Sequence, residues 1–300
     1  MTAASFAAVH PEPSGEPVSS LPSRAIVVGA SGQVGRALTA VLPGVRALTS
    51  ADLDIGSSEA VSALDLTDVD VVLNAAAYTQ VDRAEQNRAA AWRVNAAGVA
   101  NLARATAAAR VGLVHLSTEY VFDGTAPGAI PIDTPHSPLS VYGASKAAGE
   151  LVATTTPRHW VVRTSWVVGE GGNFVRTMLS LAERGIAPSV VDDQIGRPTF
   201  ADDLAHGLLL LLDHPPGIYH LTNGGDPTSW ADLARDVFRR TGHDPGAITG
   251  VPGDEYFADK PGAAPRPANS VLDLRHAAAL GIALPDWRES LGRYLKGRPQ

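Results

Sequence analysis

The feature that most constrains the fold is a short apolar segment that runs directly into a glycine-rich turn. Residues 25–28 are apolar, mostly β-branched and too few for a helix, so they predict a buried strand. Gly29, Gly32 and Gly35 follow, and helical spacing begins at residue 33 and continues to 42. Such a unit lets the backbone approach a pyrophosphate, to which the helix N-terminus offers unpaired N–H groups. The turn therefore favours dinucleotide binding over a plain strand–helix connection. Its G-x-x-G-x-x-G spacing is a variant of the G-x-G-x-x-G fingerprint of dinucleotide-binding proteins.

Strand-like and helical segments continue to alternate beyond this turn. Strands are expected at 45–48, 69–73, 113–116 and 160–162, and helices at 92–110 and 141–153. This alternation predicts an α/β fold with a doubly wound parallel sheet, the Rossmann arrangement. Past residue 168 the alternation loosens. Helices are expected there at 173–184, 204–212 and 230–240, and a long ordered loop at 254–269.

Composition and charge exclude several classes of protein. The 300 residues are 45% hydrophobic and 18% charged, which is typical of a globular protein. The formal net charge of −7 argues against a nucleic-acid polymer as a partner. The absence of cysteine excludes disulfides and thiolate chemistry, and no apolar run is long enough to span a membrane. Residues 1–23 predict a disordered tail rather than a signal peptide, so we expect a cytoplasmic protein.

The residues after the second predicted strand bear on the choice between NADPH and NADH. An acidic residue at this place would bind the adenosine ribose hydroxyls and repel a 2′-phosphate. Thr49 and Ser50 stand there instead, and Arg36 lies near the start of the first helix. Asp52 and Asp54 come slightly later. These residues favour NADPH and leave NADH as an alternative.

A tyrosine and a lysine stand four residues apart on a predicted helix. Tyr142 and Lys146 therefore share one helix face. A free phenol has a pKa near ~10, too high for ready proton transfer at neutral pH. A lysine cation about 4 Å away, at an effective dielectric constant of ~20, would favour the phenolate by roughly 4 kcal/mol, or about three pKa units before desolvation is counted. This spacing occurs by chance on many helices, but together with the glycine turn it predicts a catalytic pair.

Several further segments, in order along most of the chain after residue 23, carry a resemblance to a known family. The chain resembles the extended short-chain dehydrogenase/reductases, and within them the dTDP-4-dehydrorhamnose reductase family. The glycine turn and Tyr-x-x-x-Lys specify only the superfamily. The segments that point to the narrower branch are Ser117-Thr-Glu-Tyr-Val-Phe122, Arg163-Thr-Ser-Trp166 and Arg266-Pro-Ala-Asn-Ser270. Others that match are 74–79, 81–85, 94–95, 191–194 and 198–199.

The resemblance implies a reaction and a domain organisation. The reaction is the NADPH-dependent reduction of the 4-keto group of dTDP-4-dehydro-β-L-rhamnose to dTDP-L-rhamnose, a step of dTDP-rhamnose biosynthesis. We expect a Rossmann domain over 24–167, to which 203–222 return, and a smaller C-terminal α/β substrate-binding domain over 168–202 and 223–300. Two alternatives stay open: a reductase of another dTDP-4-keto-6-deoxysugar, as in antibiotic-sugar or dihydrostreptose pathways, or a non-catalytic regulatory subunit on the same fold.

The resemblance also implies roles for individual residues. The catalytic set is Thr118, Tyr142 and Lys146: Tyr142 would protonate the forming alkoxide, Lys146 would hold the nicotinamide ribose and lower the tyrosine pKa, and Thr118 would bind the carbonyl oxygen. The expected cofactor-binding residues are Gly29, Gly32, Gln33, Val34, Gly35, Arg36, Asp54, Ile55, Ala77, Tyr78, Thr79, Tyr142 and Lys146. The expected substrate-binding residues are Thr118, Glu119, Tyr120 and Trp166 near the sugar, with Arg266 and Asn269 near the nucleotide.

Two departures from the family pattern affect the sugar site. Glu119 stands where the family usually has aspartate, and Val168 where it usually has tyrosine. Both leave the redox residues intact and leave the sugar stereochemistry open. Some family members are reported with Mg²⁺ joining a dimer through clustered glutamates. No such cluster can be placed in this sequence, and no metal ligands are assigned, so Mg²⁺ and the choice between monomer and homodimer stay open.

Overall fold

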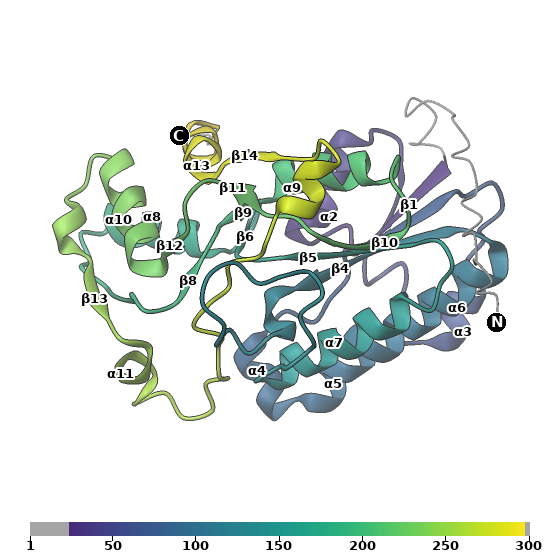
Figure 1. Ribbon diagram of the computed structural model, residues 1–300, viewed down its shortest axis with the longest axis horizontal. Helices are drawn as coiled ribbons and strands as arrows, with labels where there is room; N and C mark the ends of the chain where they lie inside the picture. Colours follow the sequence, from purple (N-terminus) through teal and green to yellow (C-terminus); the bar gives the residue numbers. More distant parts are fainter. Residues whose placement is uncertain (1–23, 298–300) are drawn as a thin grey trace, which may run out of the picture.

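A parallel sheet forms the centre of the molecule in the computed structural model, which describes residues 24–297 (Figure 1). The predicted tail at 1–23 lies outside the described residues. The sheet has six strands in the order β10-β5-β4-β3-β1-β2, and every pairing is parallel. Its strands are β1 (Ala25–Val28), β2 (Arg46–Leu48), β3 (Val71–Asn74), β4 (Gly112–Thr118), β5 (His159–Thr164) and β10 (Gly217–His220). The predicted doubly wound parallel sheet is confirmed.

The strand order places a ligand crevice beside β1. The chain passes from β1 to β2 on one side and then to β3 on the other, so the order reverses between β1 and β3. In open α/β sheets, ligands bind at the carboxyl ends of the strands that flank such a reversal. The glycine turn follows β1 and the segment 75–79 follows β3, so both reach this crevice.

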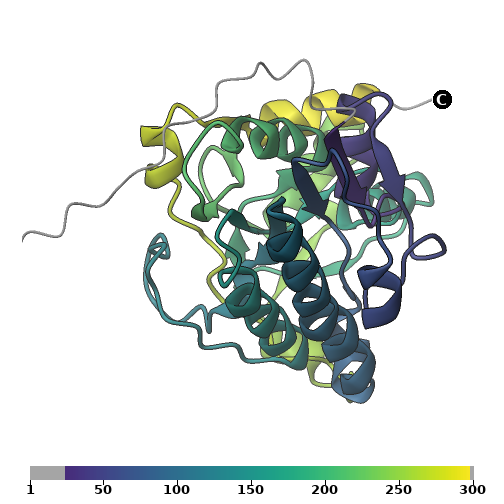
Figure 2. The ribbon, with the colours of Figure 1, turned by 90° about the vertical axis from the view of Figure 1, so that its right-hand side faces the viewer.

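Helices cover both faces of the sheet. One face carries α2 (Gln33–Val41), α9 (Ala201–Leu211) and α12 (Arg275–Ala279). The other carries α3 (Ser58–Ser62), α4 (Val81–Gln86), α5 (Arg88–Trp92), α6 (Val99–Ala109) and α7 (Val141–Ala153). Figure 2 shows α6 and α7 side by side along this second face.

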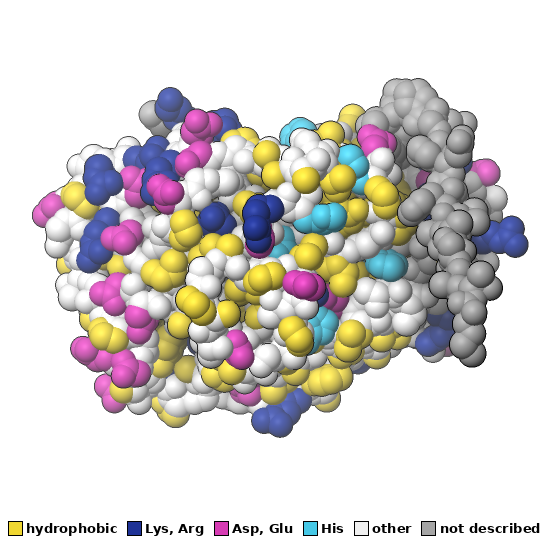
Figure 3. All heavy atoms as spheres, in the orientation of Figure 1, with side chains coloured by type: hydrophobic (Ala, Val, Ile, Leu, Met, Phe, Trp, Pro, Cys, Tyr) yellow, Lys and Arg dark blue, Asp and Glu magenta, His cyan; other side chains and the backbone are white. Residues whose placement is uncertain are grey.

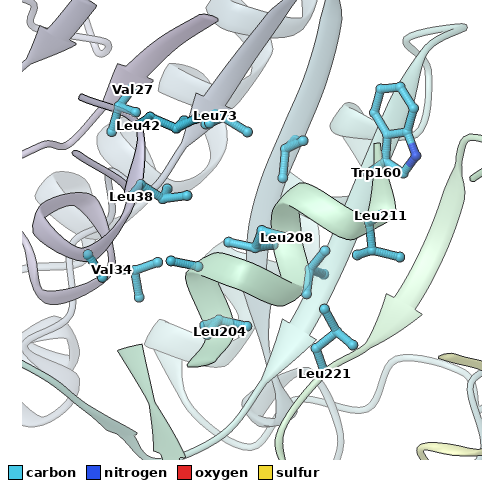
Figure 4. Packing of buried hydrophobic residues seen from close by; sticks show 14 of the residues in the cluster. Val27, Val34, Leu38, Leu42, Leu73, Trp160, Leu204, Leu208, Leu211 and Leu221 are labelled. Carbon is cyan, nitrogen blue, oxygen red and sulfur yellow. The ribbon is translucent and has the colours of Figure 1, made fainter. Parts of the chain in front are cut away.

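Alternating side chains of each strand build the two buried layers. Val27 and Leu73 point toward α2 and α9, where they meet Leu38 and Leu208 (Figure 4). Their neighbours in the strands, such as Ile26, face the opposite layer. Leu208 is completely buried, and burial of one such side chain contributes about 1.5–3 kcal/mol. The short apolar strands are therefore stable because helices cover them on both sides.

A smaller lobe, at the left of Figure 1, has a hydrophobic core of its own. Its main helices are α8 (Phe174–Glu183), α10 (Trp230–Arg240) and α13 (Trp287–Lys296). Short paired strands surround them: β6 (Val167–Val168) with β9 (Thr199–Phe200), β7 (Ser189–Val191) with β13 (Thr249–Val251), β8 (Ile195–Gly196) with β12 (Thr228–Ser229), and β11 (Asn223–Gly224) with β14 (Leu284–Asp286). The expected domain boundaries stay a prediction.

Two expected elements differ in the structure. The helix expected at 92–110 is interrupted by a π-helical turn, η2 (Arg93–Gly98), between α5 and α6. The side chain of Asn95 in this turn bonds the backbone of Tyr78, a long-range contact that helical periodicity does not reveal. The loop expected at 254–269 begins with a short helix, α11 (Gly253–Phe257). Single 3₁₀ turns, η3 (Glu119–Val121) and η4 (Pro245–Ala247), complete the elements.

The surface carries charges of both signs. On the face shown in Figure 3, Lys and Arg side chains alternate with Asp and Glu over the lobe of α8, α10 and α13, without forming one basic patch. Within residues 24–297, no helix combines the length and the apolar character needed to cross a membrane.

Candidate active site

The turn after β1 accepts only glycine at its closest contacts. Gly29 has a φ of +80°, and the backbone N–H groups of Gly29 and Ala30 both donate to the Leu48 carbonyl. A Cβ on Gly29 would lie 2.5 Å from the backbone nitrogen of Ala76, and one on Gly35 would lie 2.1 Å from the Gly29 carbonyl oxygen. The backbones of β1, β3 and α2 can approach this closely only because no side chain intervenes.

The N-terminus of α2 fits the pyrophosphate of a dinucleotide. Gly32 is the N-cap and supplies no side-chain hydrogen bond, and the first turn contains no acidic residue. The first N–H groups of a helix lack intrahelical partners and attract anions. Val34 is buried, whereas Gln33 turns its side chain aside and accepts a hydrogen bond from the Gly169 backbone at 2.6 Å. The side chains of Gln33 and Val34 therefore leave the backbone N–H groups of the first turn uncapped.

Arg36 lies beside the same turn and is half-exposed. Its Nε donates to the Ser31 carbonyl at 2.9 Å, and its Nη1 pairs with Glu170 at 3.1 Å. After β2, the Asp52 carboxylate accepts from both the backbone and the hydroxyl of Thr49. These hydrogen bonds lower the pKa of Asp52. The roles expected for Arg36 and for the residues after β2 in the choice between NADPH and NADH stay predictions.

The other expected cofactor residues follow β2 and β3 in the chain. Asp54 pairs with Arg93, and Ile55 is buried in the layer beneath. Ala77, Tyr78 and Thr79 follow β3, with Thr79 exposed. The backbone of Tyr78 is held on both sides by the Asn95 amide, with its N–H donating at 2.8 Å and its carbonyl accepting at 3.1 Å. Asn95 also donates to the Ser145 hydroxyl of α7, so it joins the cofactor edge to the tyrosine–lysine helix.

Helix α7 places Tyr142 and Lys146 in the interior, on one helix face. Ser140 caps the helix by accepting from the Gly143 backbone at 3.1 Å. A Cβ on Gly143 would lie 2.2 Å from the Tyr120 carbonyl oxygen, so glycine is required for the close approach of α7 to η3. The rings of Tyr142 and Tyr120 consequently meet edge to face, with centroids 5.4 Å apart.

Thr118 and Glu119 lie at the carboxyl end of β4, next to these tyrosines. The Thr118 hydroxyl donates to the Glu119 carboxylate at 2.7 Å and accepts from the Tyr120 backbone at 3.3 Å. Glu119 is only 2% exposed. Burial raises the pKa of Glu119 to about 7, against the opposing effect of the Thr118 hydrogen bond. The structure therefore brings the three expected catalytic residues and Glu119 into one cluster.

The surroundings of Tyr142 raise its pKa in this structure, whereas Lys146 was expected to lower it. Burial raises the pKa of Tyr142, and the nearby charge of Glu119 raises it further. Lys146 is itself buried, and its Nζ donates to the Leu116 carbonyl at 2.6 Å. Burial lowers the pKa of Lys146 to about 8, with the charge of Glu150 acting in the opposite direction. The Coulomb estimate for Lys146 did not include this cost of burying charged groups. The expected role of Lys146 in lowering the Tyr142 pKa stays a prediction.

A buried ion pair between Glu150 and Arg163, which was not predicted from the sequence, begins one helical turn beyond Lys146. Glu150 follows Lys146 by one helical turn and accepts two hydrogen bonds from the Arg163 Nε, at 2.9 and 3.1 Å. Ser117 donates to it at 2.7 Å, and His136 Nε2 lies 2.8 Å from its Oε1. The continued spacing Tyr142-x-x-x-Lys146-x-x-x-Glu150 was the available signal, because all three residues fall on one face of the helix.

Glu150 makes the stability of the protein sensitive to acid. Burial alone would raise its pKa, but hydrogen bonds from His136, Arg163 and Ser117 and the Arg163 charge outweigh burial and lower the pKa from 4.5 to about 2. This contribution to the free energy of unfolding is present above pH 4.5 and disappears as pH falls through about 2. We expect a loss of about 3 kcal/mol from this group, measured by urea unfolding at stepped pH.

Two variants distinguish the contribution of Glu150 from the loss of stability that other groups cause in acid. Glu150→Gln cannot titrate, so it should be less stable than wild type at pH 7 and should lack this part of the acid-induced loss. Glu183→Gln, at an exposed position, should follow the wild-type curve. If the free energy of unfolding fell equally for wild type and Glu150→Gln between pH 5 and 2, the lowered pKa of Glu150 would be contradicted.

The expected sugar-site residue Trp166 is stacked on a second tryptophan. Its indole lies 3.7 Å from that of Trp230, centroid to centroid, at an interplanar angle of 15°. The Trp166 backbone has a φ of +46°, an unfavourable conformation for a bulky residue. The structure holds it there with a hydrogen bond from the Thr199 backbone to the Trp166 carbonyl, at 3.1 Å. Trp230 is therefore a further candidate for the sugar wall.

Arg266 lies close to the catalytic cluster, whereas Asn269 supports a loop. Arg266 Nη2 binds both carboxylate oxygens of Asp82, at 2.8 and 2.9 Å, and its positive charge acts on the Tyr120 phenol, whose pKa is raised chiefly by burial. The Asn269 amide donates to the Ala126 and Gly128 carbonyls, at 2.8 and 2.6 Å. Asn269 also lines a cavity of about 530 Å³ that Tyr142 and Lys146 do not line. The nucleotide-binding roles expected for Arg266 and Asn269 stay predictions.

The part of the chain that the structure describes contains no group of three or more His, Cys, Asp or Glu side chains suited to hold a metal ion. The Asp82–Arg266 and Asp54–Arg93 contacts instead pair single carboxylates with single guanidinium groups.

The fold and site together define a class of protein. A parallel sheet with a glycine turn at its switch point, and a tyrosine and a lysine on the helix after β4, is the architecture of an extended short-chain dehydrogenase/reductase. The family model described as the RmlD substrate binding domain matches residues 23–298. The chain belongs to this family.

Individual relatives agree with this membership. The dTDP-4-dehydrorhamnose reductase of Mycolicibacterium smegmatis is 43% identical over 284 residues, which cover 89% of this chain and 84% of the relative. A probable dTDP-4,6-dihydroxy-2-methyloxan-3-one 4-ketoreductase of Streptomyces antibioticus is also 43% identical, over 89% of this chain and 93% of that protein. The crystal structure of Bacillus anthracis dTDP-4-dehydrorhamnose reductase, in complex with NADP, has a TM-score of 0.85 at 32% identity and covers 92% of this chain and 99% of its own.

Proposed function

We propose that this protein reduces the 4-keto group of dTDP-4-dehydro-β-L-rhamnose with NADPH, giving dTDP-L-rhamnose. The observation that carries the proposal is the cluster of Thr118, Tyr142 and Lys146 at the carboxyl edge of a sheet whose glycine turn fits a dinucleotide. Relatives named for this reaction match most of the chain. The presence of all three residues also favours an enzyme over a non-catalytic subunit on the same fold.

The chemistry divides among these three side chains. Bound NADPH supplies the hydride that adds to C4 of the sugar. The Tyr142 phenol gives its proton to the oxygen that becomes an alkoxide, and a positioned acid of this kind contributes typically ~10²–10⁴-fold. Thr118 binds the carbonyl oxygen and orients it toward the phenol. Lys146 holds the nicotinamide ribose, with its ammonium group anchored on the Leu116 carbonyl.

The Trp166–Trp230 pair is suited to bind the sugar ring, and Arg266 is suited to bind the diphosphate of the substrate. The Trp166–Trp230 stack offers an apolar wall to one side of the sugar ring. Arg266, adjacent to Tyr120, offers the guanidinium group that diphosphates bind well. We propose that Asp82 holds Arg266 ready for this contact. We further propose that the protein acts in the cytoplasm, as a monomer or a homodimer.

Arg36 should determine the preference for NADPH over NADH. If it binds the 2′-phosphate, Arg36→Ala removes a charge-assisted hydrogen bond worth about 1.5–3 kcal/mol from NADPH binding alone. The dissociation constant for NADPH should then rise by about 10- to 150-fold, with that for NADH nearly unchanged. Both constants can be measured by quenching of protein fluorescence.

Glu170→Gln is the matched control for that experiment. It removes the carboxylate that pairs with Arg36 and leaves the guanidinium in place. Affinity for NADPH should be retained or rise. Equal weakening of both cofactors in Arg36→Ala would show that Arg36 does not contact the 2′-phosphate.

A different dTDP-4-keto-6-deoxysugar is the second candidate substrate. The Streptomyces antibioticus relative, named for another ketoreduction, is as similar in sequence as the M. smegmatis reductase. The experiment that tests the function is therefore NADPH oxidation with a series of dTDP-4-keto-6-deoxysugars. Turnover with the rhamnose precursor supports the first proposal, preferential turnover of another sugar supports the second, and no turnover with any of them contradicts both.

A further inference from the structure

Helix α4 carries a carboxylate that binds the first residue of the helix on which Tyr142 and Lys146 lie. Glu85 Oε1 accepts a hydrogen bond from the Val141 backbone N–H at 2.8 Å, across 56 residues of sequence. Glu85 is half-buried, and the ion pairs described within residues 24–297 do not include it. It closes the segment 81–85, which matches the family pattern but belongs to none of the expected catalytic or binding sets. This carboxylate therefore contacts α7 rather than a cation.

The Glu85 bond brings a negative charge to the start of α7. The first N–H groups of a helix have no intrahelical partner, and its N-terminus carries a partial positive charge. Ser140 accepts from the Gly143 N–H, but the first turn of α7 contains no acidic residue. The carboxylate comes instead from α4, which lies next to the start of α7 (Figure 1). Glu85 therefore fixes the position of α7 relative to α4 in addition to capping the helix.

Tyr142 directly follows the residue that Glu85 holds. Its ring packs against Ala84 of α4 and Ala91 of α5, both fully buried. Helix α4 thus contacts the tyrosine through Ala84 and holds the adjacent backbone through Glu85. Proton transfer needs the two heavy atoms within about 2.6–3.2 Å, and a misplacement of ~1 Å can lower a rate by about 10²-fold. A small shift of the first turn of α7 is therefore large enough to affect the reaction.

Helix α4 is itself anchored by a second carboxylate. Asp82 precedes Glu85 by three residues and so lies on a neighbouring position of the same helix face. It accepts from the Ala264 backbone at 3.0 Å and from Arg266 Nη2 at 2.8 and 2.9 Å. The Glu85 carboxylate is therefore presented to α7 by a helix that is bound on its other side as well.

On the basis of the proposed reductase function, we propose that Glu85 is a positioning residue for Tyr142. It holds the first turn of α7 so that the phenol reaches the oxygen on C4 of the sugar, and it acts only through Tyr142. Lys146 has a separate anchor one turn later, on the Leu116 carbonyl. Loss of the Glu85 bond should therefore impair proton transfer from Tyr142 more than it impairs NADPH binding.

Substitutions at Glu85 test this role. Glu85→Ala should lower kcat for dTDP-4-dehydro-β-L-rhamnose by about 10- to 100-fold and leave the dissociation constant for NADPH little changed. Glu85→Gln, whose amide oxygen can still accept from the Val141 N–H, should recover most of the lost kcat. Glu59→Ala removes an exposed carboxylate from the first turn of α3 and is the matched control, which should behave as wild type.

A comparison in the Tyr142→Phe background separates positioning from a general loss of structure. Without a phenol to position, the addition of Glu85→Ala should change kcat little. A residue that only stabilised the fold would lower kcat in both backgrounds, because the two effects would then add. A loss in the Tyr142→Phe background as large as in wild type, or a wild-type kcat in Glu85→Ala, would overturn the inference.

Hydrogen exchange on the wild-type protein needs neither turnover nor a folded variant. Relative to its intrinsic rate, the Val141 amide should exchange more slowly with deuterated water than the amide of Ser58, which is the exposed first residue of α3. Equal protection of the two amides, measured by NMR, would overturn the inference. Absence of turnover in wild type would instead contradict the proposed function, so the two failures are distinguishable.

Discussion

Tyr142→Phe should lower kcat by about 10²–10⁴-fold and leave the affinity for NADPH little changed. The substitution removes one hydroxyl and keeps the ring, which packs at 5.4 Å from Tyr120 and is almost fully buried. The fold and the cofactor site should therefore survive. Steady-state kinetics and cofactor titration on the same preparation measure the two effects.

Tyr120→Phe is the matched control, because it removes the neighbouring phenol and keeps the same edge-to-face ring contact. Its loss of activity should be much smaller than that of Tyr142→Phe. If Tyr142→Phe turned over at near the wild-type rate, the proton would have to come from elsewhere, with Glu119 or water as the first candidates. The reductase assignment would then stand without this mechanism.

Lys146→Ala should lower both the rate and the affinity for the cofactor. It removes the ammonium group assigned to the nicotinamide ribose, and a charge-assisted hydrogen bond of this kind is worth about 1.5–3 kcal/mol, or roughly 10- to 150-fold in the dissociation constant for NADPH. We expect kcat to fall by about 10²-fold as well, because a nicotinamide ribose that is held less firmly no longer presents its hydride in the productive orientation.

Lys296→Ala provides the comparison for this effect, since Lys296 is exposed at the end of α13. It should behave as wild type in both measurements. A Lys146→Ala variant that lost rate but bound NADPH normally would show that Lys146 does not hold the cofactor, and its role would then be confined to Tyr142 and the Leu116 backbone.

Local patterns were sufficient to predict the elements that carry the site. Gly29, Gly32 and Gly35 lie between a short apolar strand and a helix, and this order alone identifies the turn. The spacing of Tyr142 and Lys146 places both on one face of α7. Parallel strands with intervening helices then bring the ends of β1, β3 and β4 to one edge of the sheet, so the general location of the active site could be predicted.

The properties that depend on burial and on distant partners could not be predicted in this way. The pKa of Tyr142 is raised because burial removes the phenol from water and the nearby charge of Glu119 opposes a phenolate, and neither effect can be seen in four-residue spacing. Glu150 meets Arg163 only because β5 lies beneath α7. The π-helical turn at Arg93–Gly98 accompanies the Asn95–Tyr78 contact, which spans segments far apart in the chain. Each of these features needs the fold before it can be recognised.

The most direct measurement of the central claim follows the transferred hydride. NADPH carrying deuterium at the transferable position of the nicotinamide is incubated with the protein and dTDP-4-dehydro-β-L-rhamnose, and the product is analysed by chromatography and NMR. Our account predicts one deuterium at C4 of a product identical to authentic dTDP-L-rhamnose. A product without deuterium at C4, or the C4 epimer in place of dTDP-L-rhamnose, would contradict it.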